Sequence, residues 1–241
     1  MPVSRVAGFF QHEGRHLYGS LYLPEVTEPV QVGLVLCPPF ADEAVHAHRV
    51  LVDFAVRLAG KGMPALLFDY AGTGDSEGRF EDGSLESYAR DIRGAMAYLR
   101  QRAGIRRCGL LGLRLGATLA ARMDLPAAPP AALVLWSAIL WCGEYFRGFL
   151  RSRLLTEVAT LTRRKETVRT LEERLLRGEV VDVLGYGISG AMARSFLGHA
   201  PAARDLALAA PTLMVEVGPE RAGDQPAGGG GRGPGRRGQG G

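Results

Sequence analysis

The sequence predicts an α/β protein with a doubly wound, mostly parallel sheet, and three observations lead to that prediction. Short apolar runs alternate along the chain with segments whose apolar residues recur at helical spacing. The runs are nearly continuous, as expected of strands that helices cover on both faces. With 241 residues and 46% hydrophobic content, the chain is also long enough to bury one substantial core.

The strands are expected at the apolar runs. Two short stretches within 8–22, separated by His12-Glu13-Gly14-Arg15, predict an antiparallel hairpin. The parallel strands are expected at 30–37, 64–70, 108–111, 131–136 and 209–217.

The helices between these strands have clear boundaries. Residues 46–59 carry one apolar stripe and follow a turn at 38–43. Ser84 is the expected N-cap of the next helix, which ends near Arg102. In the loop between, Ser76 is expected to have a structural role, and Asp75 is expected to accept backbone N–H groups.

The stretch 108–121, CGLLGLRLGATLAA, is the centre of the chain's chemistry. It is typical of a strand, a sharp turn and a helix, with Gly112 and Gly116 allowing the strand and helix to approach closely. The pattern G-x-S-x-G places a nucleophilic serine in such a turn, but here the central residue is Arg114. A guanidinium has no lone pair for attack on a carbonyl and stays protonated. The sequence therefore predicts a nucleophile scaffold without its usual nucleophile.

The second half of the chain changes character twice. Helical periodicity between 144 and 200 predicts a helical lid inserted between two core strands, with a peripheral helical hairpin as the alternative. After Val217 the composition becomes rich in Gly, Arg and Pro, which predicts disorder and favours a frameshifted or shortened product of a longer parent. We divide the chain into a first core part (1–143), the lid insertion (144–200), the last recognisable core strand (201–218) and a disordered tail (219–241).

A family resemblance follows from these motifs. FDYAGTGDSEG after a strand, and LLGLRLGATLAA after the next helix, resemble the α/β-hydrolase superfamily of the serine-peptidase or esterase type over residues 5–217. The segments GLRLGA, LVLWSAILWCGEYFRGFLR and VVDVLGYGIS are similar to the second hydrolase associated with exosortase A systems, which are bacterial gene neighbourhoods for exopolysaccharide synthesis and protein sorting. The resemblance implies hydrolysis of an ester or thioester, and a sheet that lacks the family's last strand.

The resemblance also assigns site residues. Arg114 occupies the nucleophile position, and the oxyanion donors would be the backbone N–H of Leu115 and one from Phe40 or Ala41. The catalytic acid has only weak candidates, which are Glu220 and Asp224.

The triad histidine has no counterpart, because all five histidines precede the strand at 209–217. His46 and His48 open a helix at the carboxyl edge of the sheet, so they either reach the cleft or lie exposed on the surface.

Two functions therefore stay open. The first is an ester or thioester hydrolase that uses an unconventional nucleophile or a bound water. The second is an inactive hydrolase-fold protein that binds an anionic ligand or a partner, with Arg114 and helix N–H groups forming the anion site. Alternatively, Arg114 pairs internally with Asp42, Glu43 or Glu144. Neither function implies a cofactor.

Composition limits the partners and the compartment. The net charge of +4 is modest, and no basic surface motif interleaved with aromatic residues occurs outside the lid, so no nucleic-acid partner is expected. Cys37, Cys108 and Cys142 lack metal-ligand spacing and are expected to be free core thiols, so no metal site is predicted. The absence of a signal segment or spanning apolar run predicts a cytoplasmic protein. A homodimer through the sheet edge at 209–217 is possible, as is peripheral contact of the lid arginines with anionic lipid.

Overall fold

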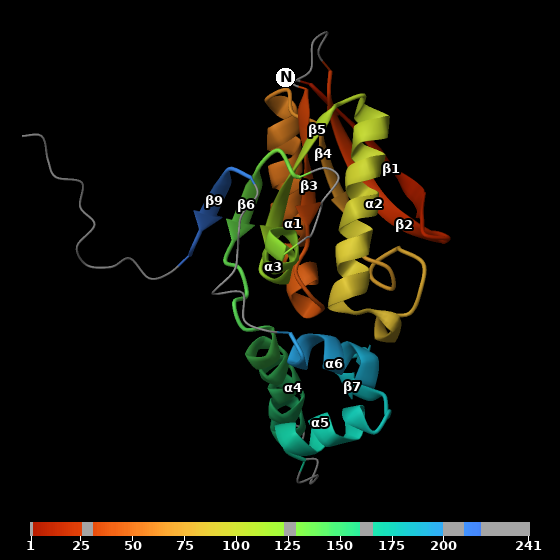
Figure 1. Ribbon diagram of the computed structural model, residues 1–241, viewed down its shortest axis with the longest axis vertical. Coiled ribbons are helices and arrows are strands. Elements are labelled where there is room, and N and C mark those ends of the chain that lie inside the picture. Colours follow the sequence, from red (N-terminus) through yellow and green to blue (C-terminus); the bar gives the residue numbers. More distant parts are fainter. Residues whose placement is uncertain (1, 26–30, 123–128, 160–165, 200–209, 218–241) are drawn as a thin grey trace, which may run out of the picture.

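The computed structural model describes residues 2–25, 31–122, 129–159, 166–199 and 210–217 (Figure 1). The main strands within these ranges are β1 (Val3–His12), β2 (Arg15–Pro24), β3 (Val32–Cys37), β4 (Ala65–Phe68), β5 (Arg107–Leu113), β6 (Leu133–Trp136) and β9 (Thr212–Val215). They form one sheet in the order β1-β2-β4-β3-β5-β6-β9, parallel from β4 to β9. This is the mostly parallel sheet that the sequence predicts.

The two ends of the sheet differ in their pairing. β1 and β2 form the expected antiparallel hairpin. It is longer than predicted, since the two strands pair along their whole length from Val3 opposite Pro24 to His12 opposite Arg15. At the other edge, β9 pairs only with β6 among the described strands, and Leu213 and Met214 are 59% and 58% exposed. The expected open edge is therefore present in the described part of the chain.

Helices cover both faces of the sheet. The helix α1 (Asp42–Gly60) packs on one face, whereas α2 (Leu85–Ala103) and α3 (Leu115–Arg122) pack on the other. The N-cap predicted at Ser84 is confirmed, since its hydroxyl accepts from the backbone N–H of Ser87 at 3.1 Å.

The start of α1 was predicted wrongly. The sequence placed a turn at 38–43 and the helix from residue 46, but the helix begins at Asp42. Ala41 has φ 51°, which reverses the chain immediately before the helix. Asp42 and Glu43 can then occupy the first turn, where acidic side chains interact favourably with the helix dipole.

The insertion lies below the carboxyl end of the sheet (Figure 1), and its buried side chains continue the core of that side of the sheet. Its elements are α4 (Cys142–Ala159), α5 (Val168–Leu176), β7 (Val181–Val183), β8 (Tyr186–Ile188) and α6 (Gly190–Leu197). The break predicted at 180–189 is a two-stranded hairpin. Five described arginines of the insertion have acidic partners; Arg147, for example, contacts Glu172 at 2.8 Å and Arg169 contacts Glu173 at 3.0 Å. Within the described ranges, no helix combines the length and apolar character needed to cross a bilayer.

Candidate functional site

The strand, sharp turn and helix predicted at 108–121 are confirmed by the backbone geometry, and we call this turn around Arg114 the elbow. Strand β5 ends at Leu113, Arg114 adopts φ 55°, and α3 begins at the next residue. A Cβ on Gly112 would lie 2.3 Å from Ala117 Cα, and one on Gly116 would lie 2.1 Å from the carbonyl oxygen of Cys37. Both distances fall far below a van der Waals contact, so the two glycines are sterically required.

Arg114 makes an ion pair with Glu43. Its Nη2 lies 3.2 Å from Glu43 Oε1 and its Nε lies 3.4 Å from Glu43 Oε2, so the ion pair is bidentate. The side chains are 40% and 37% exposed, so solvent screens the pair. Of the three acidic partners left open by the sequence, the structure selects Glu43. Asp42 contacts His46 and Glu144 contacts Arg147.

Tyr145 joins this pair from α4. Its ring centroid lies 5.8 Å from Arg114 Cζ, within the range of a cation–π contact. Burial, followed by the charge of Glu43 and a hydrogen bond with it, raises the pKa of Tyr145 well above its usual value. Tyr145 therefore remains a hydroxyl donor, and Arg114, Glu43 and Tyr145 tie the elbow to α1 and to the helical insertion.

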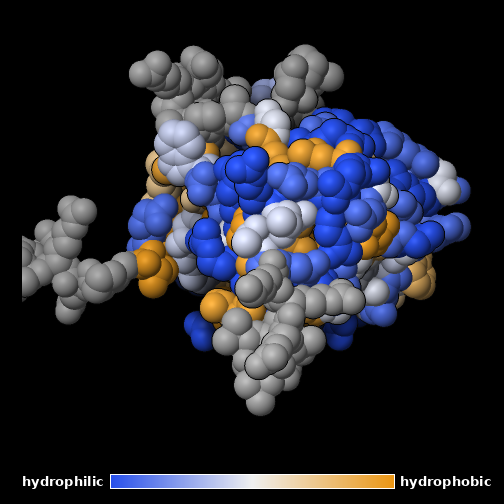
Figure 2. Space-filling model, turned by 90° about the horizontal axis from the view of Figure 1, so that it is seen from below, coloured by the Kyte–Doolittle hydropathy of each residue, from blue (hydrophilic) through white to orange (hydrophobic). Residues whose placement is uncertain are grey.

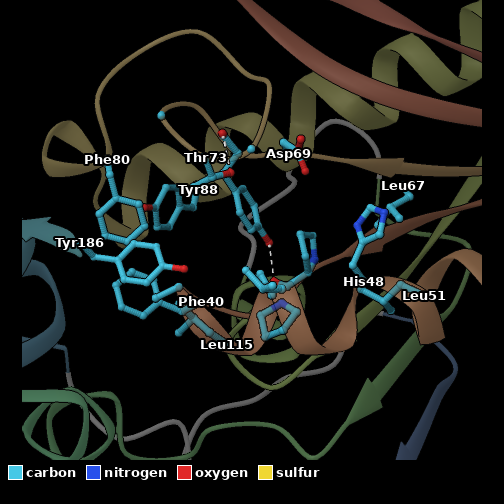
Figure 3. A pocket seen from close by; sticks show the side chains of 18 of the residues that line it. Phe40, His48, Leu51, Leu67, Asp69, Thr73, Phe80, Tyr88, Leu115 and Tyr186 are labelled. Atoms are coloured by element: carbon cyan, nitrogen blue, oxygen red, sulfur yellow. Dashed lines mark hydrogen bonds between the residues drawn. The ribbon is translucent and has the colours of Figure 1, made fainter. Parts of the chain in front are cut away.

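A cavity of about 540 Å³ lies beside the elbow at the carboxyl end of the sheet (Figure 3). Its walls come from the loop at 38–41, the loop at 69–75, α1, α2 and β8. Aromatic rings dominate one end, where the Phe40 ring is tilted against those of Phe80 and Phe196, with centroid distances of 5.4 Å and 5.1 Å. The aromatic side chains lining the cavity are Phe40, Tyr70, Phe80, Tyr88 and Tyr186.

The expected oxyanion residues lie at this cavity. Phe40, Ala41 and Leu115 all line it. Arg114 lines a second, more open groove of about 420 Å³, together with Asp42, Glu43 and His46. The elbow therefore lines both the cavity, through Leu115, and the groove, through Arg114. The Arg114 guanidinium lies in the groove together with acidic side chains.

Polar groups occupy the other end of the cavity. His48 and Asp69 both line it, and burial raises the pKa of Asp69 although the nearby His48 opposes that shift. Asp69 Oδ2 accepts the backbone N–H of Asp75 at 3.1 Å. The turn was expected to be held by the Asp75 carboxylate, but this bond comes instead from Asp69, which directly follows β4. The structural role of Ser76 is confirmed by its 2.7 Å bond to Asp69 O and 2.8 Å bond from Tyr18 N.

The remaining predicted residues have different outcomes. Glu220 and Asp224 lie outside the described residues, as does the tail at 219–241. Cys142 is buried, as expected of a core thiol. Among the described residues, histidine, cysteine and acidic side chains nowhere gather in a group of three that could hold a metal ion.

Sequence reasoning missed Asp69 and Tyr88 as cavity residues. Asp69 carried a usable signal, because it directly follows a buried parallel strand, where ligand sites of α/β sheets gather. Tyr88 instead looked like an ordinary member of the apolar stripe of α2.

The sequence of this chain matches one family model and is similar to curated proteins. Residues 34–178 match the family model described as serine aminopeptidase, S33. An uncharacterized protein from Mycobacterium tuberculosis, found in two strains, is 32% identical over 139 residues, which is 57% of this chain. The chain spans about half the length of these curated relatives, since the match covers 46% of each.

Solved structures share the fold at low sequence identity. Est1E from Butyrivibrio proteoclasticus has a TM-score of 0.59 at 17% identity over 87% of this chain and 76% of that one. Est1E with ferulic acid bound gives a TM-score of 0.58 at 17% identity, covering 87% and 89%. A hypothetical protein from Pseudomonas aeruginosa has a TM-score of 0.58 at 16% identity, covering 89% and 77%.

Proposed function

The chain belongs to the serine aminopeptidase S33 family of α/β-hydrolases, and from that premise we propose that it binds a small acyl compound without cleaving it through a serine. Arg114 carries this proposal, because it stands at the elbow in the position of the nucleophile. A covalent acyl intermediate needs a nucleophile with a free electron pair, which a guanidinium lacks.

The cavity supports an aromatic or apolar acyl ligand. Its volume of about 540 Å³ falls within the usual range of about 300–1,000 Å³ for small-molecule sites. Phe40, Phe80 and Tyr186 offer ring surfaces at one end. The ferulic acid held by Est1E, an aromatic acid on the same fold, favours this class of ligand.

The start of α3 supports an oxygen-bearing head group. Leu115 lines the cavity as the first residue of α3, and N–H groups at a helix start interact favourably with carbonyl or carboxylate oxygens. An anionic ligand reaching Arg114 would have to compete with Glu43, which already holds the guanidinium. An ester or a protonated acid therefore fits better than a ligand that relies on Arg114.

The biological setting proposed here is an exosortase A-associated system for exopolysaccharide synthesis or protein sorting. The segments GLRLGA and VVDVLGYGIS support it through their resemblance to the second hydrolase of such systems.

A second candidate is hydrolysis by an activated water. It is favoured by His48 and Asp69, an imidazole and a carboxyl group that line one cavity. If this candidate is right, any slow hydrolysis of nitrophenyl esters by the purified protein disappears in His48→Ala.

Fluorophosphonate labelling tests the main proposal directly. The purified protein is expected to remain unlabelled, and Arg114→Ser is expected to gain little labelling, since a serine without an activating base reacts poorly. Binding is measured in parallel through the rise in melting temperature with ethyl benzoate, since a ligand that binds only the native state stabilises it. Stoichiometric labelling of the parent protein would overturn the non-catalytic proposal, and the absence of any binding would overturn the ligand class.

A further inference from the structure

Tyr88 has a buried hydroxyl group without a hydrogen-bond partner. It lies in the first turn of α2 and is only 1% exposed. Within the described part of the chain, its hydroxyl oxygen has no donor or acceptor in reach. Buried polar groups in native proteins are almost always paired, so an unpaired one calls for a physical explanation.

The same tyrosine lines the cavity beside the elbow. Figure 3 shows its ring directed toward Phe80 and Tyr186, which come from the short 3-10 helix η1 (Phe80–Asp82) and from β8. Both of these aromatic side chains are half-buried, and their ring centroids lie 4.8 Å apart, so they form a partly exposed aromatic pair at the cavity.

The Tyr88 hydroxyl lies close against Gly83. A Cβ placed on Gly83 would lie 2.3 Å from the Tyr88 hydroxyl oxygen, so any larger residue would collide with it. The rings of Tyr70 and Tyr88 lie 4.8 Å apart, but the Tyr70 hydroxyl donates to the carbonyl oxygen of Pro38 at 3.3 Å. Two neighbouring tyrosines thus line one cavity, and only one of them has its hydroxyl satisfied by the chain.

We propose that the Tyr88 hydroxyl donates a hydrogen bond to a carbonyl oxygen of the bound ligand, and so selects esters and related acyl compounds over hydrocarbons of the same shape. The ligand reaches it when the half-buried Phe80 ring rotates aside. This inference rests on the proposed function, because it names the group that recognises the acyl ligand in that cavity.

Charge and burial favour a neutral acceptor. Burial and the nearby Asp91 carboxylate raise the pKa of Tyr88 well above its usual value, so its hydroxyl stays protonated and remains a donor. The surrounding aromatic rings would leave an ionised carboxylate poorly solvated, whereas an ester carbonyl loses little on entering such a site.

A pair of probes and a pair of variants test the proposal. Ethyl benzoate carries the carbonyl oxygen, and n-butylbenzene has the same chain length without any oxygen. Dissociation constants for both are measured by ligand-observed NMR with the parent protein and with Tyr88→Phe. We expect Tyr88→Phe to weaken ethyl benzoate binding about three- to tenfold, the range of one neutral hydrogen bond, and to leave n-butylbenzene unchanged.

The stability of the free protein supplies an independent readout. Tyr88→Phe removes an unpaired hydroxyl, so its melting temperature should equal or exceed that of the parent. Tyr70→Phe is the matched control: it breaks the bond to Pro38 and should lower the melting temperature, with equal effects on the two probes.

The outcomes separate the two proposals. Equal binding of ethyl benzoate to the parent and to Tyr88→Phe would overturn the role of Tyr88 while leaving acyl binding in place. A melting temperature clearly lower in Tyr88→Phe would show that the hydroxyl is already paired, and would overturn it as well. If neither probe binds the parent, the proposed function falls and takes this inference with it.

Discussion

Replacement of Gly116 by alanine tests the geometry on which the elbow depends. Gly116 lies in the first turn of α3, where it faces the end of β3. The added Cβ would be 2.1 Å from the carbonyl oxygen of Cys37 and 2.6 Å from that of Pro38. Both atoms belong to the backbone, so no side-chain rotation can relieve the overlap.

Two opposing effects set the size of the change. Alanine is the better helix former, by about 0.5–1 kcal/mol relative to glycine. Inserting a methyl group into a packed site costs about 1–3 kcal/mol, and a backbone obstacle favours the upper end. We therefore expect Gly116→Ala to lose about 2 kcal/mol of unfolding free energy, or about 4–8 °C in melting temperature.

Urea unfolding and thermal melting measure this change against an internal control. Gly148 lies in α4, and a Cβ there would meet nothing within 4 Å. Gly148→Ala should gain about 0.5–1 kcal/mol from helix propensity alone. If Gly116→Ala were as stable as Gly148→Ala, the close approach of α3 to β3 would be refuted.

Three further substitutions test other contacts. Thr118→Val should lose about 2–3 kcal/mol in urea unfolding, because the Thr118 hydroxyl both donates to Ile139 O at 2.8 Å and accepts from Ile139 N at 2.9 Å; Thr118→Ser should retain most of that stability, and equal losses would contradict the role of the hydroxyl. Glu43→Gln should lower the free energy of unfolding only slightly, since a half-exposed ion pair contributes about 0.2–1 kcal/mol. A loss of several kcal/mol of unfolding free energy in urea would mean that the pair is desolvated. Burial raises the pKa of Asp91, so its contribution to stability is full below the unfolded-state pKa of about 4 and is lost as pH rises through the folded-state pKa. Asp91→Asn should therefore gain stability relative to the parent as pH increases from about 3 to 7, and a difference independent of pH would speak against this.

Local features of the fold could be predicted because their causes are local. The elbow follows from glycines at 112 and 116 between a strand and a helix, and Ser84 caps its helix through a residue three positions later. The apolar runs likewise predicted the positions of the parallel strands, with ends at most three residues off, whereas the first strand of the hairpin begins five residues before the predicted stretch.

The site itself depends on contacts between distant residues. Arg114 and Glu43 are separated by 71 residues in the sequence. Glu43 can reach Arg114 because α1 begins at Asp42, which places Glu43 in its first turn. The start of α1 depends on the positive φ of Ala41, and an alanine in the sequence does not indicate this conformation, which is uncommon for residues other than glycine.

The unpaired state of the Tyr88 hydroxyl was also beyond sequence reasoning. Helical periodicity indicates that a side chain is buried, but not whether an acceptor stands opposite its hydroxyl.

The three buried thiols give the protein a built-in reporter of its own motions. Cys37 and Cys108 lie in the central strands β3 and β5, whereas Cys142 begins α4 at the junction with the insertion, and burial raises the pKa of all three. A thiol-specific reagent attacks the thiolate, so modification must wait for an opening that exposes the sulfur. If Cys142 reacts faster than Cys37 and Cys108, its rate of modification measures how often the insertion separates from the sheet. Equal rates at the three thiols would indicate that the molecule opens only as a whole.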